Sequence, residues 1–206
     1  MTQIPFMKAP GPFKFAALVF TIIFTLLYPT SATGGDNPSL RKKFLTYSEE
    51  TNFAKTPKFE QTREFFHRLE EYSPMVHNTS FGTSPMGREL SLVIVDKDGL
   101  TTPEEIRAQG RVIVLIESCI HSGEPDGKDA SMIFIRDMVV HKKNIDILDN
   151  VSFLFIPIFN VDGHENFTAL NRINQNGPDE LGTRNTAHQL NLNRDFLKGD
   201  APEMRA

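Results

Sequence analysis

The chain has 206 residues, of which 39% are hydrophobic, and its formal net charge is −4 at pH 7. This length is enough for one domain with a hydrophobic core. The acidic balance gives no electrostatic reason to bind nucleic acid, so we expect no nucleic-acid partner. Cys119 is the only cysteine, which excludes an internal disulfide and leaves stability to the core or to a bound metal.

The first 32 residues have the pattern of an export signal. Lys8 and Lys14 come first, and an apolar run of 14 residues follows them. Thr30 and Ala32 then supply the small residues that suit signal-peptidase cleavage. Because a membrane-crossing helix needs roughly 20 apolar residues, we predict a cleaved signal peptide over residues 1–32. The protein is then secreted or periplasmic and keeps no stable membrane span. An uncleaved membrane anchor is the alternative.

Residues 33–44 form a polar lead-in, and residues 45–206 alternate between helical and strand-like patterns. In chain order we predict a helix at 56–72, strands at 77–82 and 89–95, a short helix or loop at 101–110, a strand at 111–117, a helix at 125–143 and a strand at 150–160. From Gly163 onward the chain is polar and is predicted to form one long loop. This alternation predicts an α/β fold with a mixed, centrally parallel sheet and helices on both faces.

The strand at 111–117, "RVIVLIE", is almost continuously apolar, which predicts a strand that is covered on both faces. His121 and Glu124 follow it, at the strand end where open α/β sheets place their ligand crevices. Imidazole and carboxylate, completed by a further histidine, form a known ligand set for catalytic zinc. The alternative is a polar turn in which Glu124 contributes to the amino end of the next helix.

The same His-x-x-Glu spacing occurs a second time, at His67 and Glu70. On the predicted 56–72 helix, His67 lies nearly opposite the apolar side, so we interpret this pair as an ordinary surface contact between residues i and i+3. Only the His121 pair lies at a strand terminus beside the start of a helix. Position therefore favours His121 and Glu124 as the metal site.

Three motifs in this order resemble the zinc carboxypeptidase family: "IHSGEPDGKDA" at 120–130, "NVDG" at 160–163 and "TRNTAHQLNLNRDF" at 183–196. The resemblance covers residues 45–206. It implies that His121 and Glu124 are two of three ligands of a Zn²⁺ ion, the expected cofactor. In many relatives an aspartate orients the ligand imidazole where this chain has Asn191, whose amide oxygen accepts the ring N–H but supports the metal less well.

The resemblance also implies how a substrate is bound. Asn193 and Arg194 match the pair that receives the terminal carboxylate of a peptide, the expected partner. Arg184 matches the arginine that polarises the scissile carbonyl, and Arg172 is the competing candidate for that role. An arginine fork suits a planar carboxylate, and a second cation near the metal stabilises a developing oxyanion.

The family's third ligand and its general-base glutamate lie beyond the position that matches Ala206. The resemblance therefore implies the amino-terminal part of an exported metallocarboxypeptidase that hydrolyses the C-terminal peptide bond and is inactive as this piece alone. The 111–117 strand would then be an exposed edge, so we predict poor solubility for the 206 residues alone. Alternatives are a hydrolase of cell-wall peptides or small acylated amino acids on the same fold, and a non-catalytic carboxylate-binding protein.

Other polar residues are expected to be structural. Asp162 and Gly163 are interpreted as a turn. Cys119 is interpreted as a small buried hydrophobe, with a zinc-bound thiolate as the alternative. The remaining histidines in this region, His141, His164 and His188, are not expected to be ligands.

Overall fold

The structure, a computed structural model, describes residues 38–206, which belong to one unit of the chain, residues 36–206. The predicted signal peptide and the first part of the lead-in lie outside the described residues. Within 38–206, none of the helices has the length and apolar character needed to cross a membrane.

A four-stranded mixed sheet organises the fold, in the order β1-β2-β4-β3. Its strands are β1 (Val76–Thr83), β2 (Glu89–Val95), β3 (Val112–Glu117) and β4 (Val151–Ile156). β1 and β2 form an antiparallel hairpin, β2 and β4 are antiparallel, and β3 and β4 are parallel. The hairpin turn contains Gly87 at a φ of 81°, a left-handed conformation that favours glycine. The predicted α/β fold with a mixed sheet is confirmed.

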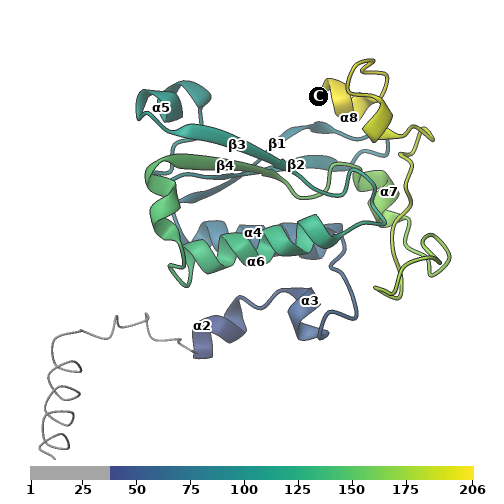
Figure 1. Ribbon diagram of the computed structural model, residues 1–206, viewed down its shortest axis with the longest axis horizontal. Helices are drawn as coiled ribbons and strands as arrows, with labels where there is room; N and C mark the ends of the chain where they lie inside the picture. The colour runs from purple at the N-terminus through teal and green to yellow at the C-terminus, as the bar shows by residue number, and fades with distance from the viewer. Residues whose placement is uncertain (1–37) are drawn as a thin grey trace, which may run out of the picture. The chain divides into compact units, whose positions relative to one another are not determined.

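Helices cover the sheet and connect its strands (Figure 1). The α-helices are α2 (Pro38–Lys43), α3 (Tyr47–Glu50), α4 (Phe59–Tyr72), α5 (Pro103–Ala108), α6 (Asp126–Val139), α7 (Val161–Glu165) and α8 (Pro202–Arg205), and the 3₁₀ helices are η1 (Ile145–Asp149) and η2 (Leu192–Arg194). α4 and α6 lie side by side under one face of the sheet, and α8 lies on the other side (Figure 1). The predicted helices at 56–72, 101–110 and 125–143 correspond to α4, α5 and α6. The lead-in is more structured than predicted, because it includes α2 and ends at the fully buried Phe44.

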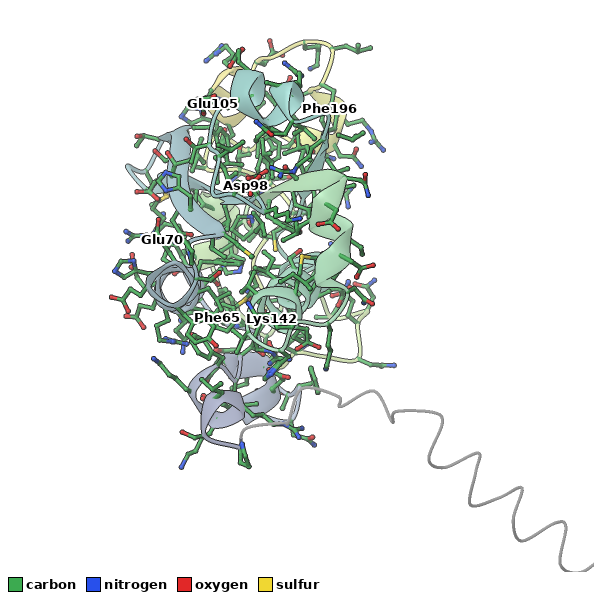
Figure 2. All side chains as sticks on the ribbon, turned by 90° about the vertical axis from the view of Figure 1, so that its left-hand side faces the viewer. Phe65, Glu70, Asp98, Glu105, Lys142 and Phe196 are labelled. Atoms are coloured by element: carbon green, nitrogen blue, oxygen red, sulfur yellow. The ribbon has the colours of Figure 1, made fainter. Side chains whose placement is uncertain are left out.

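The main core lies between the α4–α6 pair and the sheet. It includes Phe65, Phe66, Leu69, Val93, Val95, Met132, Ile135, Met138, Val139, Phe153 and Phe155. Phe65 belongs to this core, whereas Glu70, also labelled in Figure 2, reaches β1, where its carboxylate accepts hydrogen bonds from the backbone and side-chain nitrogens of Asn78 at 3.0 and 2.8 Å. Fully burying one such side chain stabilises the fold by about 1.5–3 kcal/mol. Tyr72, the last residue of α4, is 37% exposed but packs its ring edge-on to Phe44 with centroids 5.0 Å apart.

The prediction that the 111–117 strand is covered on both faces is wrong for the described residues. β3 pairs only with β4 and is an edge strand there. Val114 and Ile116 pack against the main core, but Leu115, which points to the opposite face, is 53% exposed and Val112 is 62% exposed. An apolar run shows that both faces of a strand can be buried by neighbouring elements. It does not show whether those elements are present. The family resemblance implied that this strand would be an exposed edge. Within the described residues, β3 is such an edge.

The parallel pair β3–β4 determines where the polar segments after the strands lie. Ser118 donates its N–H to Ile156 O at 2.9 Å, and Phe159 donates to Ser118 O at 2.9 Å. Asn160 continues the pairing by donating to Cys119 O at 3.2 Å. The segments that follow β3 and β4 therefore leave the sheet side by side, which brings the turn after β3 next to α7.

Candidate metal centre

His121 and Glu124 face each other on the turn that follows β3. Glu124 donates its N–H to His121 O at 2.9 Å, which closes the turn. Nδ1 of His121 lies 3.3 Å from Oε2 of Glu124. The His121 side chain is almost buried, whereas the Glu124 side chain is 40% exposed. Ser122, between them, fixes the turn to α7 because its hydroxyl donates to Asn160 O at 2.6 Å.

Asn191 holds the other nitrogen of the His121 ring. Its Oδ1 lies 3.1 Å from Nε2 of His121 and accepts the backbone N–H of Asn193 at 3.1 Å. The backbone donor identifies this amide atom as the oxygen, so Nε2 of His121 carries the hydrogen. In the neutral imidazole, Nδ1 then presents a lone pair to the carboxylate of Glu124. Two acceptors at this distance repel each other unless a proton or a cation lies between them, and the pair therefore fits a metal ion.

Two arginines approach Glu124 from the long loop after α7. Nη2 of Arg172 donates to Oε1 of Glu124 at 2.7 Å, and Nη1 of Arg184 lies 3.9 Å from the same oxygen. Partial burial raises the pKa of Glu124, but the hydrogen bond and the charge of Arg172 act in the opposite direction, and that pKa lies below its ordinary value. Glu124 is therefore ionised at neutral pH, as a metal ligand must be.

Asn193 and Arg194 belong to η2 and are exposed. Leu192, fully buried beside them, anchors η2 in a second core cluster. Nη1 of Arg194 donates to Asn193 O at 2.8 Å, and among residues 38–206 its guanidinium forms no ion pair. The structure connects this pair to His121 through the Asn191 amide rather than by direct contact.

A cavity of about 570 Å³ lies next to Arg184. Asp162 and Arg88 border it and form an ion pair of 2.7 Å. Asp162 also accepts hydrogen bonds from the Ser84 hydroxyl and from the backbone of Met86. These contacts give Asp162 a structural role, because they hold α7 against the β1–β2 hairpin. Asp162 lies in the short helix α7 and not in the predicted turn.

The second His-x-x-Glu pair lies at the surface, as predicted. The His67 side chain is 69% exposed and its Nδ1 lies 3.6 Å from Oε2 of Glu70. Cys119 is buried, and burial raises the pKa of its thiol to about 12, which disfavours a thiolate ligand. Within the described part of the chain, no three His, Cys, Asp or Glu side chains are grouped so that they could hold a metal ion. His121 and Glu124 alone thus offer two donors, fewer than the three protein ligands of a catalytic zinc site.

A buried polar network near this turn was not predicted from the sequence. Lys128 and His164 are fully buried, and Nζ of Lys128 contacts Nε2 of His164 at 3.0 Å and Pro57 O. Nδ1 of His164 donates to Glu165 Oε1 at 2.9 Å, and that oxygen also accepts the backbone N–H of Phe59 at 2.9 Å. The network joins the starts of α4 and α6 to α7.

Burial determines the proton affinities in this network. It lowers the pKa of Lys128. Burial and then the charge of Lys128 lower the pKa of His164 to about 4. The sequence contains one signal of this network, because Lys128 lies at i, i+4, i+7 and i+11 spacing with the buried Met132, Ile135 and Val139 of α6.

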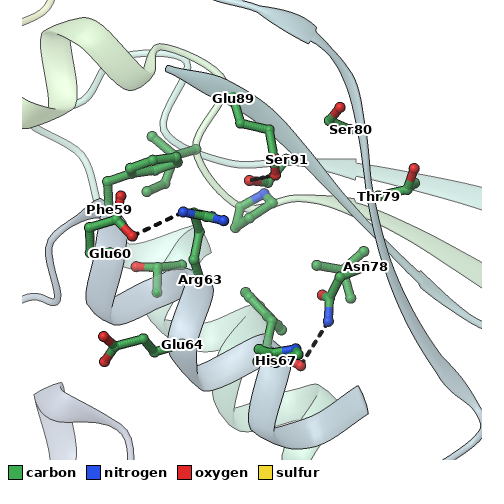
Figure 3. Close-up of a pocket in the computed structure, with 15 residues that line it drawn as sticks. Phe59, Glu60, Arg63, Glu64, His67, Asn78, Thr79, Ser80, Glu89 and Ser91 are labelled. Atoms are coloured by element: carbon green, nitrogen blue, oxygen red, sulfur yellow. Dashed lines mark hydrogen bonds and ion pairs between the residues drawn. The ribbon is translucent and has the colours of Figure 1, made fainter. Parts of the chain in front are cut away.

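A second cavity, of about 520 Å³, lies between α4 and the β1–β2 hairpin (Figure 3). Arg63 and Glu60 line it and form an ion pair of 3.0 Å. None of the residues that line it belongs to the candidate metal centre. This cavity is therefore separate from the proposed chemistry.

A model of the zinc carboxypeptidase family matches residues 62–204. The chain belongs to the zinc carboxypeptidase family. The match includes the turn with His121 and Glu124, both loop arginines and η2. No curated protein matches the chain.

Solved structures support the family's fold. A metallo-carboxypeptidase from Burkholderia cenocepacia is 21% identical, with a TM-score of 0.53, over 72% of this chain and 36% of that one. A putative carboxypeptidase A from Shewanella denitrificans is 20% identical, with a TM-score of 0.55, over 74% of this chain and 36% of that one. The chain thus corresponds to about a third of the length of these relatives, and at this level of identity the likeness establishes the fold.

Proposed function

We propose that the protein is an exported zinc-dependent carboxypeptidase that removes the C-terminal residue of peptides. The observation that supports this most strongly is the arrangement around His121. Its Nδ1 faces Glu124 Oε2 at 3.3 Å, while Asn191 holds its Nε2. Export rests on the pattern of residues 1–32 and not on the described structure.

Zinc would be held by Nδ1 of His121 and the carboxylate of Glu124. When bound, zinc lowers the pKa of water to about 7 and polarises a carbonyl group. Catalytic zinc sites use three protein ligands, so we infer that a third ligand comes from outside the described residues. The general base is inferred to come from there as well.

Arg184 is the better candidate for the residue that stabilises the developing oxyanion. Its side chain is 43% exposed and borders the 570 Å³ cavity, so it can meet a substrate. The Arg172 side chain is only 15% exposed and is already engaged by Glu124. A guanidinium within reach of the reacting carbonyl stabilises negative charge as it forms.

Asn193 and Arg194 are proposed to bind the terminal carboxylate of the peptide. Both are exposed and lie on a segment that Asn191 joins to the zinc ligand His121. A guanidinium and a neighbouring amide give a planar carboxylate several charge-assisted hydrogen bonds. The same contact explains why a substrate with a free C-terminus would be preferred.

The test uses the full-length gene product and a peptide pair that differs only in a free or an amidated C-terminus. We expect hydrolysis of the free peptide only, its loss with a chelator, and its recovery with zinc. His121→Ala should abolish it, while His67→Ala, the matched change in the surface pair, should not. A wild-type protein that binds zinc and peptide but hydrolyses neither substrate would refute the assignment in favour of a non-catalytic binding protein.

A further inference from the structure

Arg172 makes the shortest ionic contact of the candidate site. Its Nη2 lies 2.7 Å from Oε1 of Glu124, although 48 residues separate the two in the sequence. Oε2, the other oxygen of Glu124, faces His121. The two carboxylate oxygens therefore have different partners, and Arg172 is bound to the one that does not face His121.

The stem of Arg172 also packs directly on the turn. A Cβ at Gly123 would lie 2.5 Å from Cγ of Arg172 and 2.9 Å from Gly182 O, so only glycine fits between Glu124 and Ser122. The loop is thus in van der Waals contact with the backbone that carries His121 and Glu124.

Gln175 completes this contact from the same loop. In the amide orientation that satisfies its neighbours, its nitrogen donates to Gly123 O at 2.8 Å and its oxygen accepts from Nη2 of Arg172 at 2.9 Å. The backbone N–H of Gln175 donates to Arg172 O at 3.0 Å, which closes a turn between the two residues. Arg172 and Gln175 therefore hold both the side chain of Glu124 and the backbone before it.

We propose that Arg172 is a positioning residue for Glu124, and not the residue that acts on the scissile carbonyl. It fixes Oε1 so that Oε2 stays directed at Nδ1 of His121, where the cation of the proposed function would bind. This inference rests on that proposed function. Partners that orient a metal ligand typically change metal affinity by about 10–100-fold when they are removed.

The charge of Arg172 works in the opposite direction, because a guanidinium repels a nearby divalent cation. Arg172→Lys separates the two effects, since lysine keeps the charge but loses the planar fork that reaches Glu124 and Gln175 together. We expect the zinc Kd of R172K in the full-length protein to rise by about tenfold or more, as measured by competition with a chromophoric chelator. Arg107→Lys, an exposed residue of α5 remote in sequence from this loop, is the matched control and should leave the Kd unchanged.

A second readout distinguishes positioning from loss of folding. With cobalt in place of zinc, the visible absorption spectrum of R172K should differ from wild type at saturating metal, while the melting temperature of the metal-free protein stays the same. Gln175→Ala tests the same contact without touching a charge, and should also raise the Kd.

The possible failures are distinguishable. If wild-type protein binds no zinc, the proposed function and this inference fall together. If wild type binds zinc and the folded variants R172K and Q175A bind it equally well with an unchanged cobalt spectrum, the inference alone is overturned.

Discussion

Replacing His164 with glutamine should remove part of the pH dependence of the protein's stability. His164 is fully buried, with Lys128 of α6 at one ring nitrogen and Glu165 of α7 at the other. Protonating Nε2 would place two cationic groups 3.0 Å apart at a site where neither side chain is exposed to solvent. Glutamine is neutral at all these pH values and retains an oxygen that can accept from Lys128.

The magnitude follows from the pKa of His164, which lies at about 4 against an ordinary value of 6.5. Because the folded pKa is depressed, the unfolded chain takes up the proton first as the pH falls below 6.5, and stability is lost between 6.5 and 4. From pH 7.5 to pH 5.0 this one residue should reduce the free energy of unfolding by about 2 kcal/mol. Most carboxylates titrate below this window, so their contribution there is smaller.

The assay is urea denaturation at pH 7.5 and 5.0, followed by far-ultraviolet circular dichroism. The wild type should lose about 2 kcal/mol more than His164→Gln between the two pH values. His67→Gln, which changes an exposed histidine of α4, should keep the wild-type pH dependence. Equal losses in wild type and H164Q would refute the assignment of a neutral, buried His164.

Three further predictions concern the rest of the fold. Asp96→Ala should lower the free energy of unfolding by about 3 kcal/mol, because it removes the buried carboxylate that pairs with Arg111 at 3.0 Å and accepts from the Ser152 hydroxyl, and leaves the buried Arg111 with the half-exposed Asp98 alone. An unchanged urea midpoint would contradict this. Cys119 should resist a thiol reagent at pH 8 in the folded protein and react fully in denaturant, since the residue is 4% exposed and burial raises the pKa of its thiol to about 12. Rapid labelling of the folded protein would contradict this. Val112→Lys and Leu115→Lys should increase the soluble yield of the 206-residue chain, because both side chains lie exposed on an edge strand. If the wild-type chain is already soluble and monomeric, the exposed edge does not cause aggregation.

The elements of the fold could be predicted because their patterns are local. The phenylalanine-rich stripe of α4 and the apolar runs of β3 and β4 repeat at helix and strand periods, and the hairpin has a glycine at its turn. The exposure of β3 could not be predicted in this way. It depends on which elements lie beside the strand, and an apolar run does not contain that information.

The candidate site could be predicted in part for the same reason. His121 and Glu124 are three residues apart at a strand end, so their meeting follows from local geometry. The contact between Arg172 and Glu124 crosses 48 residues through a loop without regular structure, and no periodicity connects them. The sequence left Arg172 and Arg184 as competitors, and their different burial now supports different roles.

The most direct test of the account is the zinc content of the full-length gene product. After dialysis against zinc and then against zinc-free buffer, the account predicts about one tightly bound zinc per polypeptide. His67→Ala should keep this zinc, and His121→Ala and Glu124→Gln should lose it. A folded wild-type protein that retains no zinc, or a His121→Ala variant that retains it fully, would contradict the central claim.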